Sequence, residues 1–164
     1  LPSDWTVADF GCGTGRLAAD LAPHIQRVVG IDNSPAMLEA AATQTQFLGY
    51  VELNQGQLTA APLEDSSCDA VRCVLVLTYL DDPAAVLAEM ARVLKPGGKA
   101  VVVDLMLHDR DDFRRSLGQR SMGFTPESLG QLFTEVGLTA ANCRSLKPAP
   151  EAKGPTLLLG TAQR

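Results

Sequence analysis

The chain has 164 residues, which is long enough for one domain with its own hydrophobic core. Its net charge is −5 and its basic residues are scattered, which argues against direct contact with nucleic acid. No apolar run approaches the roughly 20 residues of a membrane-spanning helix, and the start lacks a signal peptide's basic region. We therefore expect a cytoplasmic protein, away from membranes, forming one domain over 1–164.

Strand-like apolar segments alternate with helical patterns along the chain. The strands are expected at Trp5–Phe10, Arg27–Asp32, Gly49–Asn54, Cys68–Leu75 and Lys99–Leu107. The helices are expected at Arg16–Ala22, at Ala36–Thr43 after the cap Ser34-Pro35, at Asp82–Leu94 and at Thr125–Val136. This alternation predicts an α/β fold with a doubly wound, Rossmann-like, mostly parallel sheet.

Two closing strands, Leu138–Leu146 and Thr156–Ala162, are separated by a short segment that contains Pro and Gly. This spacing predicts an antiparallel hairpin at one edge of the sheet. At the other end of the chain, Leu1 is not an initiator Met and a strand follows almost at once. We expect further residues, or a further domain, before Leu1.

The four cysteines do not form a C-x-x-C pair, which favours reduced thiols over a metal site or a disulfide framework. We predict no metal ligands. Cys68 and Cys73 are five residues apart, so on one regular strand their side chains would face opposite sides of the sheet.

The stretch DFGCGTG, Asp9–Gly15, follows the first strand, where a doubly wound sheet binds its ligands. The glycines allow a sharp turn and a close approach of a ligand to the backbone. Their spacing is G-x-G-x-G and not the G-x-G-x-x-G of dinucleotide enzymes. Asp9 would repel a pyrophosphate and could pair with an ammonium group, so a cationic nucleoside is favoured.

Asp32 ends the second strand, where an acid can accept hydrogen bonds from both hydroxyls of a ribose. The alternative is a plain turn residue before Ser34-Pro35. The letters D-F-G also occur in protein kinases, but the chain lacks the strand lysine and the H-R-D loop of a kinase.

Four segments together resemble the class I S-adenosylmethionine-dependent methyltransferases, in particular the small-molecule type that includes quinone-biosynthesis enzymes. The segments are VADFGCGTG, VVGIDNSPAMLEAA, LEDSSCDAV and ARVLKPGG. The later LHDRDDFRRSLGQRSMGFTPESL and APEAKGP resemble a narrower group, the methyltransferase domains fused to arsenic-repressor-type winged-helix regulators. That likeness implies an attached DNA-binding domain.

The resemblance implies that S-adenosylmethionine is the cofactor and assigns a part of it to each motif. The methionine end would lie on Asp9, Gly11, Cys12, Gly13 and Gly15, and the ribose on Asp32. The adenine would lie beside Asn33, Met37, Gly56, Gln57 and Leu58, and the sulfonium beside Val74, Leu75 and Leu77.

The acceptor side departs from the family pattern, because Thr78, Gln119 and Ser121 stand where relatives carry His or aromatic residues. His108 is the candidate base and Tyr79 the candidate wall of the acceptor pocket; a solvated loop histidine and ordinary packing are the alternatives. We predict methyl transfer to a small molecule. The alternative is a cofactor-sensing regulatory domain, and the chain could also pair with a second copy as a homodimer.

Overall fold

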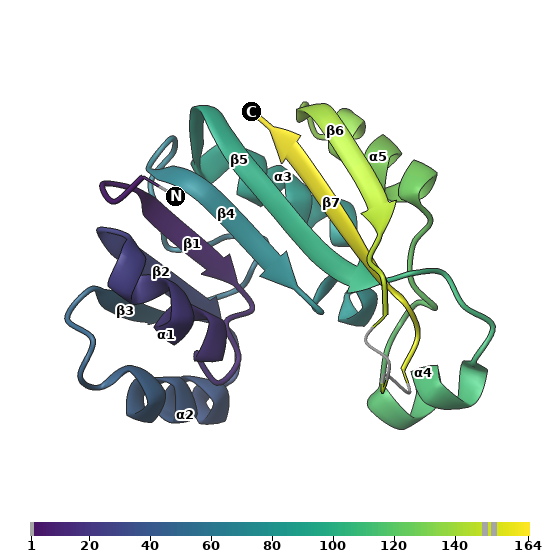
Figure 1. The fold of residues 1–164 in the computed structure, drawn as a ribbon, viewed down its shortest axis with the longest axis horizontal. Helices are drawn as coiled ribbons and strands as arrows, with labels where there is room; N and C mark the ends of the chain where they lie inside the picture. The colour runs from purple at the N-terminus through teal and green to yellow at the C-terminus, as the bar shows by residue number, and fades with distance from the viewer. Residues whose placement is uncertain (1, 149–150, 152–153) are drawn as a thin grey trace.

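The computed structural model describes residues 2–148, 151 and 154–164, and it contains a twisted sheet flanked by helices (Figure 1). The sheet has seven strands in the order β3-β2-β1-β4-β5-β7-β6. The strands are β1 (Thr6–Phe10), β2 (Arg27–Asp32), β3 (Val51–Gln55), β4 (Cys68–Val74), β5 (Leu94–Leu105), β6 (Thr139–Ser145) and β7 (Leu157–Gln163).

Strands β3, β2, β1, β4 and β5 are all parallel, and β7 and β6 are antiparallel to their neighbours. The predicted Rossmann-like sheet with an antiparallel edge hairpin is therefore confirmed. The hairpin has an added feature, because β7 inserts between β5 and β6 and leaves β6 at the edge. Within the segment 149–155, residues 149–150 and 152–153 lie outside the described residues, so the APEAKGP motif is not described as a whole.

The helices cover both faces of the sheet, as expected for a doubly wound fold. The helices are α1 (Arg16–Leu21), α2 (Pro35–Thr45), α3 (Pro83–Val93), α4 (Asp111–Leu117) and α5 (Pro126–Glu135), with short 3-10 turns η1 (Ala22–His24) and η2 (Leu77–Tyr79). Helices α3 and α5 bury the larger apolar cluster, with Leu87, Met90, Leu129 and Phe133 fully buried. Helix α1 buries a smaller cluster around Ala18 and Val28.

The predicted helix starts are confirmed by their caps. Ser34 Oγ accepts a hydrogen bond from Met37 N at 3.4 Å, and Asp82 Oδ1 accepts one from Ala85 N at 3.1 Å. Thr125 forms a capping box with Ser128. In each helix the residue after the cap is Pro, whose missing N–H costs nothing in the first turn.

The region around β4 and β5 differs from the prediction in two ways. Strand β5 begins at Leu94, earlier than the predicted Lys99, and Lys95 Nζ pairs with Asp69 Oδ1 at 2.8 Å. Cys68 and Cys73 do not face opposite sides, since both are buried in the same apolar cluster. The cause is a register shift between Cys68 and Ala70, which turns Cys68 toward the face that Cys73 shares.

Helix α5 lies so close to β7 that a side chain at Gly160 has no room. A Cβ there would lie 2.6 Å from Leu129 Cδ2 and 2.9 Å from Phe133 Cε2, both of them in the core. We expect Gly160→Ala to lower the free energy of unfolding by about 1–3 kcal/mol in urea denaturation, because it overpacks this contact. Gly49→Ala is the control, since nothing lies within 4 Å of its Cβ position. Equal stability of the two variants would contradict the close packing of α5 on β7.

Candidate functional site

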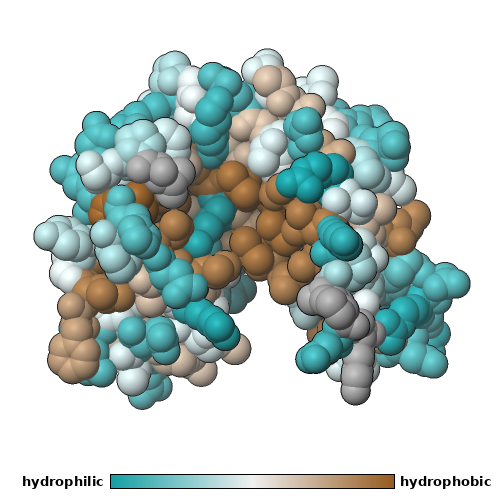
Figure 2. Space-filling model, in the orientation of Figure 1, coloured by the Kyte–Doolittle hydropathy of each residue, from teal (hydrophilic) through white to brown (hydrophobic). Residues whose placement is uncertain are grey.

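A cleft of about 580 Å³ opens at the carboxyl ends of β1, β2 and β4, a size typical of small-molecule sites. Figure 2 shows this hollowed side of the molecule, with apolar surface gathered in its centre. Ten of the predicted site residues line the cleft: Gly11, Gly13, Asp32, Asn33, Met37, Gln57, Leu58, Val74, Leu75 and Tyr79. The other predicted residues, Asp9, Cys12, Gly15, Gly56, Leu77 and His108, are not in its lining.

The glycine loop after β1 is fastened to the end of β2 by backbone hydrogen bonds. The carbonyl oxygen of Ile31 accepts from Gly11 N at 2.8 Å and from Cys12 N at 3.0 Å. Gly15 has a φ of 76° as the cap of α1, and a Cβ there would lie 2.8 Å from Ala41 Cβ. Glycine at position 15 is therefore needed for the turn and for the contact between α1 and α2.

Asp32 connects this loop to the start of α2. Its Oδ2 accepts from Gly13 N at 2.9 Å, and its Oδ1 accepts from Ser34 N at 2.9 Å. Each carboxylate oxygen can accept a second hydrogen bond, so both remain able to accept from a pair of hydroxyls. Asp32 thus has a structural role, as a turn residue would, and it also lines the cleft.

The backbone at Gly13 borders open space, which a bound nucleoside requires. Gly13 lines the cleft with a φ of 53°, and a Cβ at this position would meet nothing within 4 Å. A side chain there would project into open space, and the bare backbone leaves that space for a ligand. The residues present therefore fit S-adenosylmethionine at this end of the cleft.

Asp9 lies below the cleft and not at its mouth. It is 2% exposed, and its Oδ2 accepts a hydrogen bond from Arg72 Nη2 at 2.8 Å. Burial raises the pKa of Asp9, while the adjacent Arg72 guanidinium opposes that rise. The acid is recognisable from the sequence, whereas its cationic partner on β4 is not.

Cys12 is a buried thiol and not a candidate nucleophile. Burial raises its pKa to about 12, and the carboxylates of Asp9 and Asp32 add to the effect. Among the described residues, no three His, Cys, Asp or Glu side chains gather closely enough to hold a metal ion. Over the same residues, no helix is long and apolar enough to cross a bilayer.

The loop between β3 and β4 forms the wall that carries Gln57 and Leu58. Helix α3 holds the loop in place, since Glu89 Oε1 accepts from Ala61 N at 2.7 Å. Arg92 Nη2 donates to Ala61 O at 3.2 Å and to Leu63 O at 2.9 Å. The hydrogen bond from Arg92 lowers the pKa of Glu89, so this carboxylate stays ionised at neutral pH. Gly56 is part of the same loop, and a Cβ there would lie 2.9 Å from Pro62 Cδ.

The opposite end of the cleft is apolar and follows β4. Its residues are Val74, Leu75, Val76, Tyr79, Leu80 and Val86. Leu75 has a φ of 56°, an unusual conformation for a residue other than glycine, and its side chain is 44% exposed. Leu77, which we expected here, is fully buried in the core instead. Backbone strain of this kind is concentrated at ligand sites.

His108 follows β5 and is half-buried. Its Nδ1 accepts a hydrogen bond from Arg110 N at 3.1 Å, so the neutral ring carries its proton on Nε2. That Nε2 is buried and has no hydrogen-bond partner among the described residues. In this arrangement His108 can donate a hydrogen bond but has no free lone pair, so its predicted role as a base requires the Arg110 contact to open.

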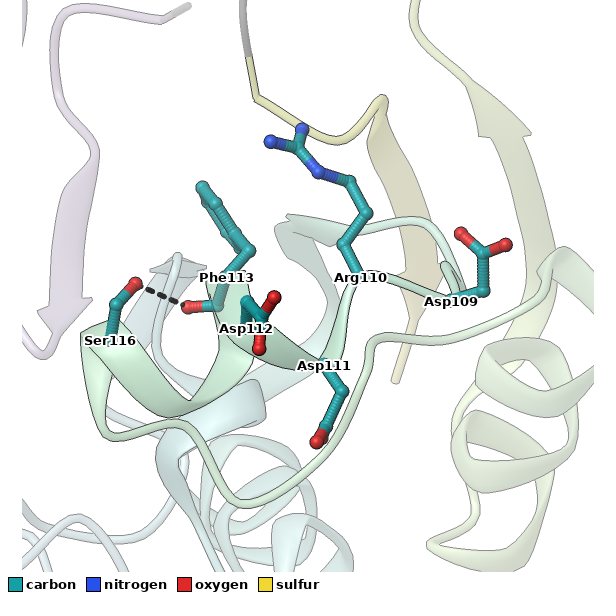
Figure 3. Close-up of a pocket in the computed structure, with 6 residues that line it drawn as sticks. All are labelled: Asp109, Arg110, Asp111, Asp112, Phe113 and Ser116. Carbon is teal, nitrogen blue, oxygen red and sulfur yellow. Dashed lines mark hydrogen bonds between the residues drawn. The ribbon is translucent and has the colours of Figure 1, made fainter.

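A second depression lies on α4 and is drawn in Figure 3. Arg110 lies over the Phe113 ring, with Cζ 5.1 Å from the ring centroid. Asp111 pairs with Arg114 at 2.8 Å and with Arg115 at 2.6 Å. The charges of this helix largely neutralise one another, in agreement with a solvated helix face.

A family model described as a methyltransferase domain matches residues 8–102. The chain belongs to this methyltransferase family. The match runs from β1 to β5 and so includes the glycine loop, Asp32 and the cleft. S-adenosylmethionine is the cofactor of these class I methyltransferases, as the motifs indicated.

The methyltransferase domain is 44% identical over 100 residues to an uncharacterised 37.1 kDa protein of transposon TN4556 from Streptomyces fradiae. It is 36% identical over 107 residues to a demethylmenaquinone methyltransferase of Bacillus licheniformis. These matches cover 59% and 63% of this chain but only 29% and 46% of the two relatives.

A solved structure with the same fold is a Haloferax volcanii methyltransferase in complex with the Trm112 methyltransferase activator. Its TM-score is 0.86 at 24% identity, over 99% of this chain and 84% of that one. At this identity the likeness establishes the fold and not the activity.

Four cleft residues were missed from the sequence: Thr59, Val76, Leu80 and Val86. Thr59 directly follows the predicted Gln57-Leu58 pair, and Val76 directly follows Leu75. Both could therefore have been predicted as neighbours of residues already assigned to the site. Val86 belongs to the buried apolar face of α3 and also lines the cleft, so one side chain serves both the core and the cleft wall.

Asp32→Ala is expected to weaken binding of S-adenosylhomocysteine by at least about tenfold, or roughly 1.4 kcal/mol. The substitution removes the ribose acceptor and leaves Gly13 N and Ser34 N without their partner. Calorimetric titration measures the change. Asp20→Ala on the exposed side of α1 is the control and should bind as the parent does. Unchanged affinity in Asp32→Ala would refute the ribose role.

Proposed function

We propose that this protein transfers the methyl group of S-adenosylmethionine to an apolar small molecule. The observation that carries the proposal is the two-part cleft, with hydrogen-bonding groups around Asp32 at one end and apolar side chains around Leu75 and Tyr79 at the other. The first part suits a nucleoside. The second part suits an acceptor that leaves water for an apolar surface.

The chain's own residues would hold the cofactor in three places. Asp32 would accept hydrogen bonds from the ribose, and Gln57 would accept one from the adenine amine. Gln57 is an uncharged amide, so its contact is weaker than that of a carboxylate. Asn33 and Met37 would flank the base, and Val74 would border the sulfonium.

When bound, S-adenosylmethionine supplies a methyl group on a positively charged sulfur, which an acceptor atom attacks in line. The apolar side chains after β4 would exclude water and fix the angle of approach, and such positioning is a large part of catalysis. Tyr79 would form one wall of the acceptor pocket. His108 would donate from Nε2 to an acceptor oxygen, and it would serve as a base only after Arg110 N releases Nδ1.

The apolar half of the cleft favours an apolar acceptor, and the name of one relative points to the same class of acceptor. The Bacillus licheniformis relative is a demethylmenaquinone methyltransferase. An apolar ring compound fits a cleft that combines Leu75, Leu80 and Val86.

Product formation distinguishes turnover from the alternative function, a cofactor-sensing domain attached to a DNA-binding domain. The full-length protein is incubated with methyl-labelled S-adenosylmethionine and a set of hydroquinones, phenols and hydrophilic amines, and products are detected by mass spectrometry. We expect methylated hydroquinone or phenol. Tight cofactor binding with no product from any acceptor or cell extract would favour the sensor. Absence of cofactor binding would overturn both functions.

Leu75→Asn should separate acceptor binding from stability. Asn tolerates a positive φ better than Leu does, so the thermal midpoint should stay the same or rise. The loss of apolar surface should raise KM for the acceptor about fivefold, which corresponds to roughly 1 kcal/mol. Leu17→Asn on α1, which is 39% exposed in the parent, is the control. An unchanged KM in Leu75→Asn would place the acceptor elsewhere.

A further inference from the structure

Buried polar atoms without hydrogen-bond partners are grouped on the segments that follow β4, β5 and α4. The atoms are Thr78 Oγ1, His108 Nε2, Gln119 Oε1 and Ser121 Oγ, and none has a partner among the described residues. Thr78 is fully buried and Gln119 is 5% exposed. We call these four side chains the polar seam. A buried polar atom without a partner is destabilising, so several of them in one region indicate a site for a polar ligand.

Backbone hydrogen bonds hold the three segments of the polar seam together. The carbonyl oxygen of Thr78 accepts from Arg120 N at 2.8 Å and from Ser121 N at 3.2 Å. His108 N donates to the carbonyl oxygen of Met122 at 3.0 Å. The segment after α4 therefore packs against η2 and also against the loop that follows β5.

The polar seam adjoins the apolar end of the cleft. Thr78 is the middle residue of η2, and the next two residues, Tyr79 and Leu80, line the cleft. Asp104 Oδ2 accepts from Thr78 N at 3.4 Å, which fixes the turn. Burial raises the pKa of Asp104 and the Thr78 hydroxyl opposes that rise, although Thr78 Oγ1 lacks the geometry of a hydrogen bond. A ligand that lies against Tyr79 is therefore one residue from the polar seam.

Two glycines with positive φ bound the segment that carries Gln119 and Ser121. The φ angles are 69° at Gly118 and 100° at Gly123. Hinges are a few loop residues of this kind, which absorb backbone rotation. The unpartnered atoms are closed off from the surface, so a ligand reaches them when the segment between the glycines moves away from η2. That movement breaks no side-chain hydrogen bond between members of the polar seam.

We propose that the polar seam binds an uncharged oxygen group of the methyl acceptor, a hydroxyl or a carbonyl. The inference rests on the proposed function and deepens it, since the rest of the acceptor lies in the apolar end of the cleft. The hydroxyls of Thr78 and Ser121 and the His108 Nε2–H can donate to an oxygen. Gln119 Oε1 can accept from a hydroxyl. These groups are uncharged, so a charged ligand group would lose its hydration without gaining a counter-ion.

Two probes of similar size separate hydrogen bonding from apolar contact. Naphthol carries a hydroxyl on its first ring carbon, and fluoronaphthalene carries at the same carbon a fluorine, which is a poor hydrogen-bond acceptor. Each is titrated into the full-length protein with saturating S-adenosylhomocysteine and followed by ligand-observed NMR. An apolar cleft alone would favour fluoronaphthalene, because the hydroxyl loses its hydrogen bonds to water. We expect naphthol to bind at least about threefold more tightly. Equal or tighter binding of fluoronaphthalene would overturn the inference.

Thr78→Val tests the site with a readout that a structural role would move the other way. The substitution replaces an unpartnered buried hydroxyl by a methyl group, so the thermal midpoint should stay the same or rise. The preference for naphthol should fall to about one or below, with the affinity for S-adenosylhomocysteine unchanged. Ser121→Ala carries the same test if Thr78→Val fails to fold.

Thr45→Val is the matched control. Thr45 is also buried, but its Oγ1 donates to the carbonyl oxygen of Ala41 at 2.8 Å. Removal of this paired hydroxyl should lower the thermal midpoint and leave the preference for naphthol unchanged.

The outcomes have distinct meanings. If Thr78→Val lowers the thermal midpoint as Thr45→Val does and keeps the preference for naphthol, the Thr78 hydroxyl is a structural group and the inference is overturned. If the parent binds S-adenosylhomocysteine and both probes but favours fluoronaphthalene, the inference fails and the proposed function stands. If it binds S-adenosylhomocysteine and neither probe, the inference is overturned and the product screen decides the proposed function by itself. If it does not bind S-adenosylhomocysteine, the proposed function fails and the inference fails with it.

Discussion

The carboxylate of Asp32 sets the geometry on which the cleft depends. It accepts from the glycine loop at Gly13 N and from the cap of α2 at Ser34 N, so one side chain holds together two loops that end different strands. The carbonyl of Ile31, one residue earlier, holds the same loop at Gly11 and Cys12. The floor of the cleft is therefore in place before any ligand arrives, which lowers the entropic cost of binding.

The sequence predicts most of this architecture because its signals are local. Strand β2 was predicted with its observed bounds, since Gln26 and Asn33 flank a short apolar run. The caps at Ser34, Asp82 and Thr125 need only a few consecutive residues to form. The glycine spacing and Asp32 also indicated the ligand class from local sequence. The glycines lie in one loop, and Asp32 lies at the end of one strand.

The contacts that were missed depend on which strands are neighbours. Arg72 reads from the sequence as an isolated charge in an apolar strand, and its role appears only when β4 lies beside β1. The shared face of Cys68 and Cys73 depends on a local register shift, which alternation alone cannot reveal. For His108 the residue type suggests a base, whereas the backbone N–H of Arg110 decides which nitrogen carries the proton.

Because β7 lies between β5 and β6, the edge of the sheet cannot form until the end of β7 has been synthesised. Strand β6 leaves the ribosome first but has no neighbour until β7 is made, because β7 is the strand it pairs with. Until then β5 presents an unpaired edge, which is the kind of surface that promotes association between incomplete chains. Pairing with β7, Leu157–Gln163, therefore covers the edge of β5 and gives β6 its place in the sheet.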